Sequence, residues 1–384
     1  MRFALLGSDD DVMALAHAAR YAGHELAWCG DMLPQHLAEL AILRPSRDDW
    51  EVLLDDQFCD GVIVGHGAAT ADLRLEQLQK LVGNEIPVLI TRLPVDSVLP
   101  FHEIDMLRRE KRSLVQRYHP EIDHPWIALL AQSCGDSESE LGPVQQISLE
   151  RGGVGADRES VIAALARDIE LLERLAGVLT SVSAIGATGD AQQLRGLTVQ
   201  LIGPREIPVR WSLAPHGANR LTLVGEDQRL TVEMPPAPAA WLADGGTAAL
   251  DAPAEFNAPR HAIDEYTSAL AAGDRGAAAE DYSTWESATA AMEVADVVEL
   301  SLQKGRTIEV HHQQLTEDLA FRGTMSALGC GLLIVALVGV VLAGIFGDVL
   351  GFPIKTLWPI LLLGVFGIFL LLQLVPKLFP PRDS

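Results

Sequence analysis

Near the start of the chain, three consecutive aspartates could do chemistry. Asp9, Asp10 and Asp11 follow Gly7 and Ser8 directly. Carboxylates at such a position usually cap the first turn of a helix, where free backbone amides favour negative charge. The same oxygens could instead ligate a metal ion, or hold a phosphate through a bridging cation. The residue types favour the capping role and leave the other two open.

Further candidates are isolated basic side chains. His66 has a glycine on either side and could contact a ligand, although a single loop histidine is more often only solvated. Arg92 and Arg167 carry guanidinium groups, which clamp carboxylates and phosphates. The structural alternative is an ion pair with Asp168 or Glu170, and we favour it. These side chains can form a binding site only if the fold brings them together.

The first third of the chain alternates short apolar runs with helical patterns. The expected strands are 3–6, 25–29, 61–64 and 87–90, and the expected helices are 12–22, 37–43, 50–54 and 73–82. Apolar strands without alternation, separated by helices, are typical of a parallel sheet buried on both faces. We predict a doubly wound, Rossmann-like α/β domain over residues 1–120.

Residues 121–310 have a different pattern. A helix is expected at 158–176, and strands are expected at 144–149, 180–184, 197–202, 209–213, 221–224 and 230–234. Strands joined by turns predict a mostly antiparallel open sheet with a helix against it. Residues 235–259 are rich in Pro, Ala and Gly and read as a linker. A last helix should begin at Ser283, where Ser-Thr-Trp-Glu fits a capping box.

Composition excludes some functions. The net charge is −23, from 29 basic and 52 acidic residues, and so acidic a body repels phosphate backbones. We expect no nucleic-acid partner. The four cysteines lack CxxC spacing, which suits free thiols in a reducing compartment and offers no metal site. No signal peptide is expected, because the first apolar run is too short.

Two uncharged runs stand near the end of the chain. Residues 324–346 and 357–375 are each long enough, as helices, to cross a bilayer. Buried core helices are the alternative, but they rarely lack charge over five turns. The pattern predicts a transmembrane hairpin over 324–375, with the lipid bilayer as its partner. Lys and Arg flank the outer ends, so we expect a multi-pass membrane protein whose soluble body faces the cytoplasm.

The chain resembles the Gfo/Idh/MocA family, named for glucose–fructose oxidoreductase and inositol dehydrogenase. The order of elements over 1–310 resembles that family. So do the stretches RFALLG, AGHELAWCGD, DWEVLLDDQFCDGVIVG and AMEVADVVELSLQKGRTIEV. The resemblance implies a dinucleotide-binding domain followed by an α/β domain. In this family the open sheet of the second domain forms the substrate wall and often a homo-oligomer interface. The implied activity is NAD(P)-dependent hydride transfer on sugars, cyclitols or related alcohols.

The nucleotide motif departs from the family pattern. The expected G-x-G-x-x-G reads Gly7-Ser8-Asp9-Asp10-Asp11-Val12, so aspartates stand where two phosphates should rest. In the family an acid at the position of Asp31 holds the adenosine ribose, although Asp31 could equally be an ordinary loop or cap residue. The implied cofactor contacts are Gly7, Asp9, Val12, Asp31, Gly65, His66 and Pro94. We expect NAD or NADP binding to be weak or lost.

The expected proton carriers are also absent. Family members take a lysine from Glu-Lys-Pro, and here the tripeptide is Arg92-Leu93-Pro94. The family's helical aspartate and histidine fall on Ala163 and Arg167. An aliphatic side chain moves no proton, and arginine stays protonated near neutrality.

Two functions follow from these residues. A non-catalytic relative that senses a ligand or binds a partner is favoured, as a pseudoenzyme. The alternative is an atypical NAD(P)-dependent oxidoreductase. It would need a replacement proton donor, for which Tyr118, His119 and His124 near the domain junction are candidates.

Overall fold

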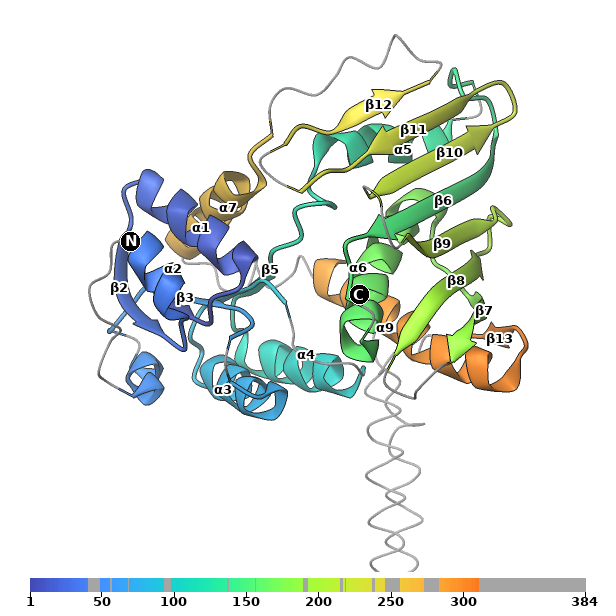
Figure 1. Cartoon of the computed structure of the whole chain (residues 1–384). Helices are drawn as coiled ribbons and strands as arrows, with labels where there is room; N and C mark the ends of the chain where they lie inside the picture. Colours follow the sequence, from blue (N-terminus) through green and yellow to red (C-terminus); the bar gives the residue numbers. More distant parts are fainter. Residues whose placement is uncertain are drawn as a thin grey trace, which may run out of the picture. The chain divides into compact units, whose positions relative to one another are not determined.

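A computed structural model describes residues 1–310, except 41–48, 56, 68, 93–97, 137, 156, 189–192, 215–216, 218, 237–238, 246–255 and 273–282. These residues belong to one compact unit, Met1–His312. Within it the chain builds two sheets, each from its own part of the sequence (Figure 1).

The first sheet is parallel and has the order β2-β1-β3-β4-β5. Its strands are β1 (Arg2–Leu6), β2 (Glu25–Gly30), β3 (Gly61–Val64), β4 (Val88–Ile90) and β5 (Val115–Arg117). The chain goes from β1 to one side, then crosses back to β3 on the other. The carboxyl ends of β1 and β3 therefore flank a topological switch point, where α/β sheets bind ligands.

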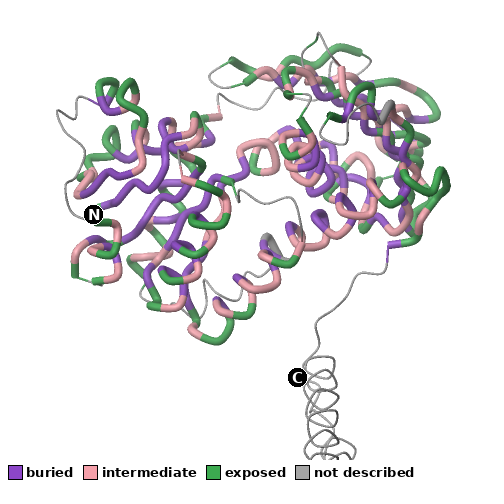
Figure 2. The backbone as a smooth tube through the Cα atoms, turned by 60° about the horizontal axis from the view of Figure 1, so that its bottom comes forward, coloured by how far each residue is buried: buried purple, intermediate pink, exposed green. Residues whose placement is uncertain are grey.

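Helices cover both faces of this sheet. One face packs against α1 (Asp10–Tyr21) and α7 (Ala258–Ala272), with Phe3, Ile63 and Tyr266 in the shared core. The other packs against α3 (Ala71–Gly83) and α4 (Leu99–Lys111). Two short helices, α2 (Pro34–Glu39) and the 3-10 helix η1 (Trp50–Leu54), lie between β2 and β3 in sequence. Figure 2 shows these strands buried and the exposed residues gathered on the outer helices and loops.

The second sheet has eight strands in the order β12-β11-β10-β6-β9-β8-β7-β13. They are β6 (Val144–Gly152), β7 (Ser181–Thr188), β8 (Leu194–Ile202), β9 (Val209–Ala214), β10 (Arg220–Gly225), β11 (Arg229–Glu233), β12 (Leu242–Asp244) and β13 (Ile308–Glu309). Every pair is antiparallel except β6 with β9.

One face of this sheet is apolar and covered. Leu149, Trp211 and Val199 share one row across β6, β9 and β8 and pack with α6 (Arg158–Ala176) and α9 (Ser283–Lys304). A further helix, α5 (Pro125–Gly135), packs on α6. The other face carries polar side chains in register, such as Ser148, Arg210 and Gln200.

The α/β class and the mostly antiparallel second sheet confirm the predictions from the sequence. Three helices, α4, α5 and α7, were not predicted. The expected linker 235–259 was wrong in part, because β12 and the start of α7 lie within it. A helix was expected at 37–43, and the structure has α2 at Pro34–Glu39. Residues 41–43 lie outside the described residues.

The predicted membrane localisation requires correction. No helix in the described part of the chain is long and apolar enough to cross a bilayer. Its longest helix, α9, carries acidic residues such as Glu293 and Glu299 along its length. The runs 324–346 and 357–375, which carried the prediction of a multi-pass protein facing the cytoplasm, lie outside the described residues.

Candidate functional site

At the switch point, the turn after β1 is tied closely to the loop after β3. Gly7 has a φ of 108°, a left-handed conformation that favours glycine. An added Cβ there would overlap the Gly65 carbonyl oxygen. The Ser8 amide donates to the His66 carbonyl oxygen at 2.8 Å, and the Gly7 amide donates to that of Gly30 at 3.1 Å. Glycine at position 7 thus allows two loops to touch across the crevice.

The Asp9 carboxylate fills the centre of this point. One oxygen accepts from the Val12 amide at 2.7 Å, which caps α1 as predicted. The other accepts from the His66 amide at 2.7 Å and from the Thr91 hydroxyl at 2.9 Å. Donors from α1, from the loop after β3 and from the end of β4 therefore converge on one carboxylate.

Asp31, directly after β2, also binds within the protein. Its φ is 53°, an unusual value for a residue with a side chain. Its carboxylate pairs with the guanidinium of Arg74 on α3 and accepts from the Ala69 amide at 3.2 Å. Arg74 is almost fully buried. Asp31 is thus a loop residue in contact with the β3–α3 connection, and it does not cap a helix.

These contacts bear on whether a dinucleotide fits. In this fold the pyrophosphate rests on free amides at the first helix N-terminus, and an acid after β2 holds the ribose. Here the Val12 amide already donates to Asp9, and Asp31 already holds Arg74. A pyrophosphate would have to displace one carboxylate and lie beside two more, Asp10 and Asp11. The residues present do not fit a bound pyrophosphate.

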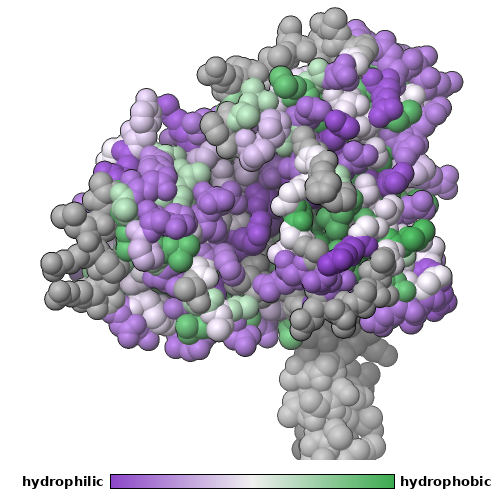
Figure 3. Space-filling model, in the orientation of Figure 1, coloured by the Kyte–Doolittle hydropathy of each residue, from purple (hydrophilic) through white to green (hydrophobic). Residues whose placement is uncertain are grey.

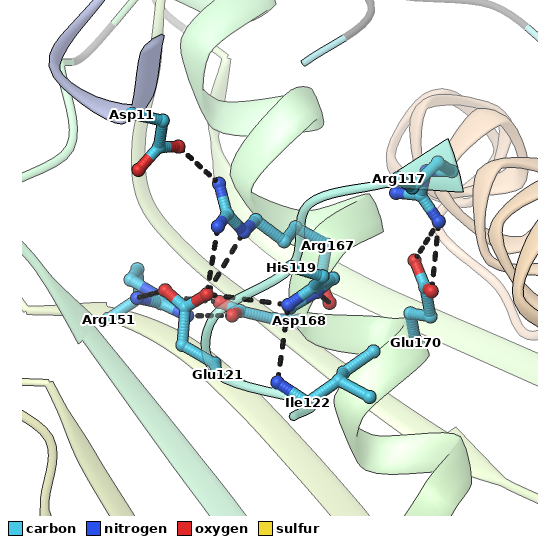
Figure 4. Close-up of polar contacts among 9 residues, drawn as sticks. All are labelled: Asp11, Arg117, His119, Glu121, Ile122, Arg151, Arg167, Asp168 and Glu170. Atoms are coloured by element: carbon cyan, nitrogen blue, oxygen red, sulfur yellow. Dashed lines mark hydrogen bonds and ion pairs between the residues drawn. The ribbon is translucent and has the colours of Figure 1, made fainter. Parts of the chain in front are cut away.

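A second polar cluster surrounds Arg167 on α6 (Figure 4). Its guanidinium contacts Asp11 Oδ2 at 3.3 Å and Glu121 Oε2 at 3.0 Å. Asp11 belongs to α1, and Glu121 lies in the segment between β5 and α5. Arg167 therefore joins α6, which packs on the second sheet, to α1, which packs on the first sheet, and to the segment between β5 and α5. Arg167 does form ion pairs within the protein, but the predicted partners, Asp168 and Glu170, are wrong.

Those two acids have arginine partners of their own. Arg151, on β6, pairs with Asp168 through two nitrogens, one at 2.8 Å. The indole nitrogen of Trp211 donates to the same carboxylate at 2.7 Å. On the other side of α6, Arg117 donates to both oxygens of Glu170, at 2.9 and 2.8 Å. The Arg151–Asp168 pair is bidentate, with two nitrogens on two oxygens, a geometry that is strong and directional.

Burial and charge set the pKa values in the cluster. Burial alone would raise the pKa of Glu121, but Arg167, His119 and Arg151 outweigh it and hold that pKa well below its ordinary value. Burial raises the pKa of Asp11, and Arg167 only partly offsets this. Burial would lower the pKa of Arg167, but Glu121 and Asp11 raise it. Arg167 thus stays charged and has no proton to exchange near neutrality.

The candidate replacement donors have other roles. His119 is buried; its Nδ1 accepts from the Ile122 amide at 3.3 Å and its Nε2 lies 3.1 Å from the Arg167 carbonyl oxygen. His124 caps α5 and stacks on Trp241 at 3.9 Å, and burial lowers its pKa to about 4. Tyr118 is buried, which raises its pKa. These environments suit structural side chains.

The remaining predicted site residues are spread over the crevice. His66 is exposed and Val12 is buried, and both contact Asp9 through backbone amides. Ala163 is half-buried on α6, and Arg92 is exposed. Leu93 and Pro94 lie outside the described residues. Among the described residues no group of His, Cys, Asp and Glu is arranged to hold a metal ion, so the metal alternative for Asp9–Asp11 has no support.

Sequence reasoning missed four residues that build these clusters: Arg74, Thr91, Glu121 and Arg151. Two had a readable signal. On β6, Ile147, Leu149 and Arg151 alternate along the strand and so point to the same face of the sheet. The pattern therefore indicates a charged side chain on the covered face. Arg74 precedes Leu78 and Leu81 at helical spacing. A charge on a buried face requires a partner.

We expect Glu121 to make stability depend on pH. Because its folded pKa is depressed, its contribution is present above the unfolded value, 4.5, and is lost as pH falls below it. Asp11 has a raised pKa and so acts in the opposite direction. The wild type should therefore lose more stability between pH 6 and pH 3 than Glu121→Gln, as measured by urea midpoints. Glu233→Gln, on the exposed face, is the matched control. Parallel profiles for the wild type and Glu121→Gln would contradict this.

Comparison with known proteins gives the class of fold. No family model and no curated protein matches the sequence. Solved structures do. A putative myo-inositol dehydrogenase from Sinorhizobium meliloti matches with a TM-score of 0.62 at 14% identity, over 81% of this chain and 100% of that one. GenD2 from gentamicin A biosynthesis, solved in complex with NAD, matches with a TM-score of 0.63 at 16% identity, over 81% and 96%.

An aldose–aldose oxidoreductase from Caulobacter crescentus, complexed with glycerol, is also similar, with a TM-score of 0.63 at 14% identity over 80% of this chain and 99% of that one. The chain thus has the fold of Gfo/Idh/MocA-type oxidoreductases, as the sequence resemblance predicted. At such identities the likeness establishes the fold, and the function has to be argued from the site.

Proposed function

We propose that this protein is a non-catalytic relative of these oxidoreductases that binds a small molecule in the inherited cleft or a partner through its open sheet. The observation that carries the proposal is the position of Arg167. The family resemblance assigns the proton-carrying histidine to this place. Arg167 is instead fixed between Asp11 and Glu121, two carboxylates from different elements.

The proposal has a chemical basis. Oxidation of an alcohol requires a group that takes the hydroxyl proton as hydride leaves, and such a group is typically worth about 10²–10⁴-fold in rate. A guanidinium held by two carboxylates cannot take that proton. Ala163, on the same helix, cannot orient a base.

A cleft suited to a polar ligand remains. Figure 3 shows this face of the described unit hollowed between the elements of the two sheets, with hydrophilic residues lining the hollow. An interaction of this kind requires no cofactor.

We expect the full-length protein to show no NAD(P)-dependent oxidation of cyclitols, hexoses or glycerol above background. The measurement is nicotinamide absorbance at saturating cofactor, with an active inositol dehydrogenase as the positive control. Turnover in the wild type would overturn the non-catalytic proposal. If His119→Ala or His124→Ala then abolished that turnover, the replacement proton donor would be identified.

The second candidate is an atypical NAD(P)-dependent oxidoreductase of sugars, cyclitols or related alcohols. Similarity over 81% of this chain to a putative myo-inositol dehydrogenase and to GenD2, which was solved with NAD, favours it and supports a nucleotide cofactor for this candidate. An oligomer through the open face of the eight-stranded sheet and the lack of a nucleic-acid partner stay predictions.

A further inference from the structure

We propose that Asp9 is a resident anion in the phosphate subsite of this fold, and that this one carboxylate excludes dinucleotides from the crevice. The inference deepens the non-catalytic proposal by naming the residue that prevents cofactor binding. It rests on that proposal only in assuming that the protein works without NAD(P).

The geometry around Asp9 is that of an anion site with its anion in place. The donors are a backbone amide at a helix N-terminus, a second backbone amide and a hydroxyl, within 2.7–2.9 Å of the carboxylate. They come from Val12, His66 and Thr91, which are far apart in sequence. Amides at such a terminus bind phosphate oxygens in dinucleotide domains. Here the two carboxylate oxygens of Asp9 satisfy these donors.

Position 9 corresponds to the second glycine of the dinucleotide motif. That glycine lets the backbone approach the pyrophosphate closely. A side chain there removes the space, and a carboxylate adds a charge of the same sign as the phosphates. Steric and electrostatic effects therefore act together against the cofactor.

The charge of Asp9 has a local counterpart. Arg74 is a buried cation of this crevice and pairs directly with Asp31. Burial lowers the pKa of Arg74, and the charges of Asp31 and Asp9 partly offset this. Two internal carboxylates and one internal arginine thus occupy the region that a bound dinucleotide would contact. The crevice is held together without a ligand.

Removing the carboxylate should open the subsite. Wild-type protein should bind NAD and ADP-ribose no tighter than about 0.1 mM. Asp9→Gly frees two amides and a hydroxyl, and Asp9→Ser frees the His66 amide and the Thr91 hydroxyl. Each variant should bind both ligands at least about tenfold more tightly, since charge-assisted contacts are gained and repulsion is lost. Binding is measured by calorimetry on the full-length protein, with inorganic pyrophosphate as a probe of the phosphate subsite alone.

Asp10→Ser is the matched control. It removes the same charge at the neighbouring residue, which is exposed. It should tighten binding much less than Asp9→Ser does, because the three donors of the subsite are held by Asp9. Asp9→Ser keeps a hydroxyl that can cap α1, so it covers the case in which Asp9→Gly fails to fold. Circular dichroism checks the folding of each variant.

Three results would overturn the inference. They are micromolar binding by the wild type, no gain in a folded Asp9→Ser variant, and an equal gain in Asp10→Ser. Its failure is distinguishable from failure of the non-catalytic proposal, because the readout is binding and requires no turnover. A wild type that turns over substrate would refute that proposal, whereas a folded Asp9→Ser without added affinity would refute this one.

Discussion

Replacing Arg167 with methionine should lower the free energy of unfolding by up to about 3–5 kcal/mol, because it leaves the Glu121 carboxylate, whose side chain is 21% exposed, without its main partner. Glu121 accepts from Arg167 through two nitrogens, at 3.1 and 3.0 Å. Methionine keeps much of the side-chain volume, so the loss reports charge and hydrogen bonding more than packing. Urea denaturation of the full-length protein measures it.

Two variants make this result specific. Arg220→Met removes an arginine from an exposed ion pair with Glu233, and it should change stability by less than about 1 kcal/mol. Adding Glu121→Gln to Arg167→Met should cost less than the sum of the two single changes, because the unpaired charge is gone. If Arg167→Met lowered the free energy of unfolding no more than Arg220→Met does, the Arg167 cluster would not be what holds α6 to α1.

The partners of Arg167 show where sequence reasoning reaches its limit. The prediction chose Asp168 and Glu170 because they are close in sequence. Asp168, one residue on, cannot face Arg167 on a helix, whereas Glu170, three residues on, could do so. In the structure Asp168 pairs with Arg151 and Glu170 pairs with Arg117. Arg167 faces Asp11 and Glu121, which only the folded chain brings near.

The hydrogen bonds of Asp9 also divide into one that the local sequence predicts and two that depend on the fold. Its capping bond to Val12 spans three residues and follows from the local pattern. Its bonds to His66 and Thr91 depend on the order of β1, β3 and β4 in the sheet. The sequence indicated a negative charge at the phosphate subsite. That the charge is already bound there required the structure.

The same distinction explains the helices. The longer strands and α6 have continuous or strongly periodic apolar patterns, and their positions were predicted closely. The short strands β5, β12 and β13 were not predicted. The buried face of α7 consists largely of Ala258, Ala262 and Ile263 next to a Pro- and Ala-rich stretch, so its pattern is weak. In α4 an arginine, Arg108, lies on the buried face, which breaks the apolar period. Tertiary packing supports these helices where local patterns are faint.

The second large effect is expected at Asp168. This residue is fully buried and accepts from both Arg151 and Trp211. Asp168→Ala should cost about 3–5 kcal/mol, because the buried guanidinium of Arg151 loses its bidentate partner and the indole nitrogen loses its acceptor. Asp157→Ala, which removes an exposed helix cap at the start of the same helix, should cost only about 0.5–2 kcal/mol.

The pair can also be replaced as a unit. Arg151→Met with Asp168→Leu removes both buried charges and keeps the volume close, and such swaps are often neutral or stabilising. The double variant should therefore be more stable than Asp168→Ala, although Trp211 still lacks its acceptor. Thermal and urea unfolding of the full-length proteins test this order. If the double variant were as unstable as Asp168→Ala, the loss would come from packing against α6, and the buried ion pair would not be what stabilises this side of the cleft.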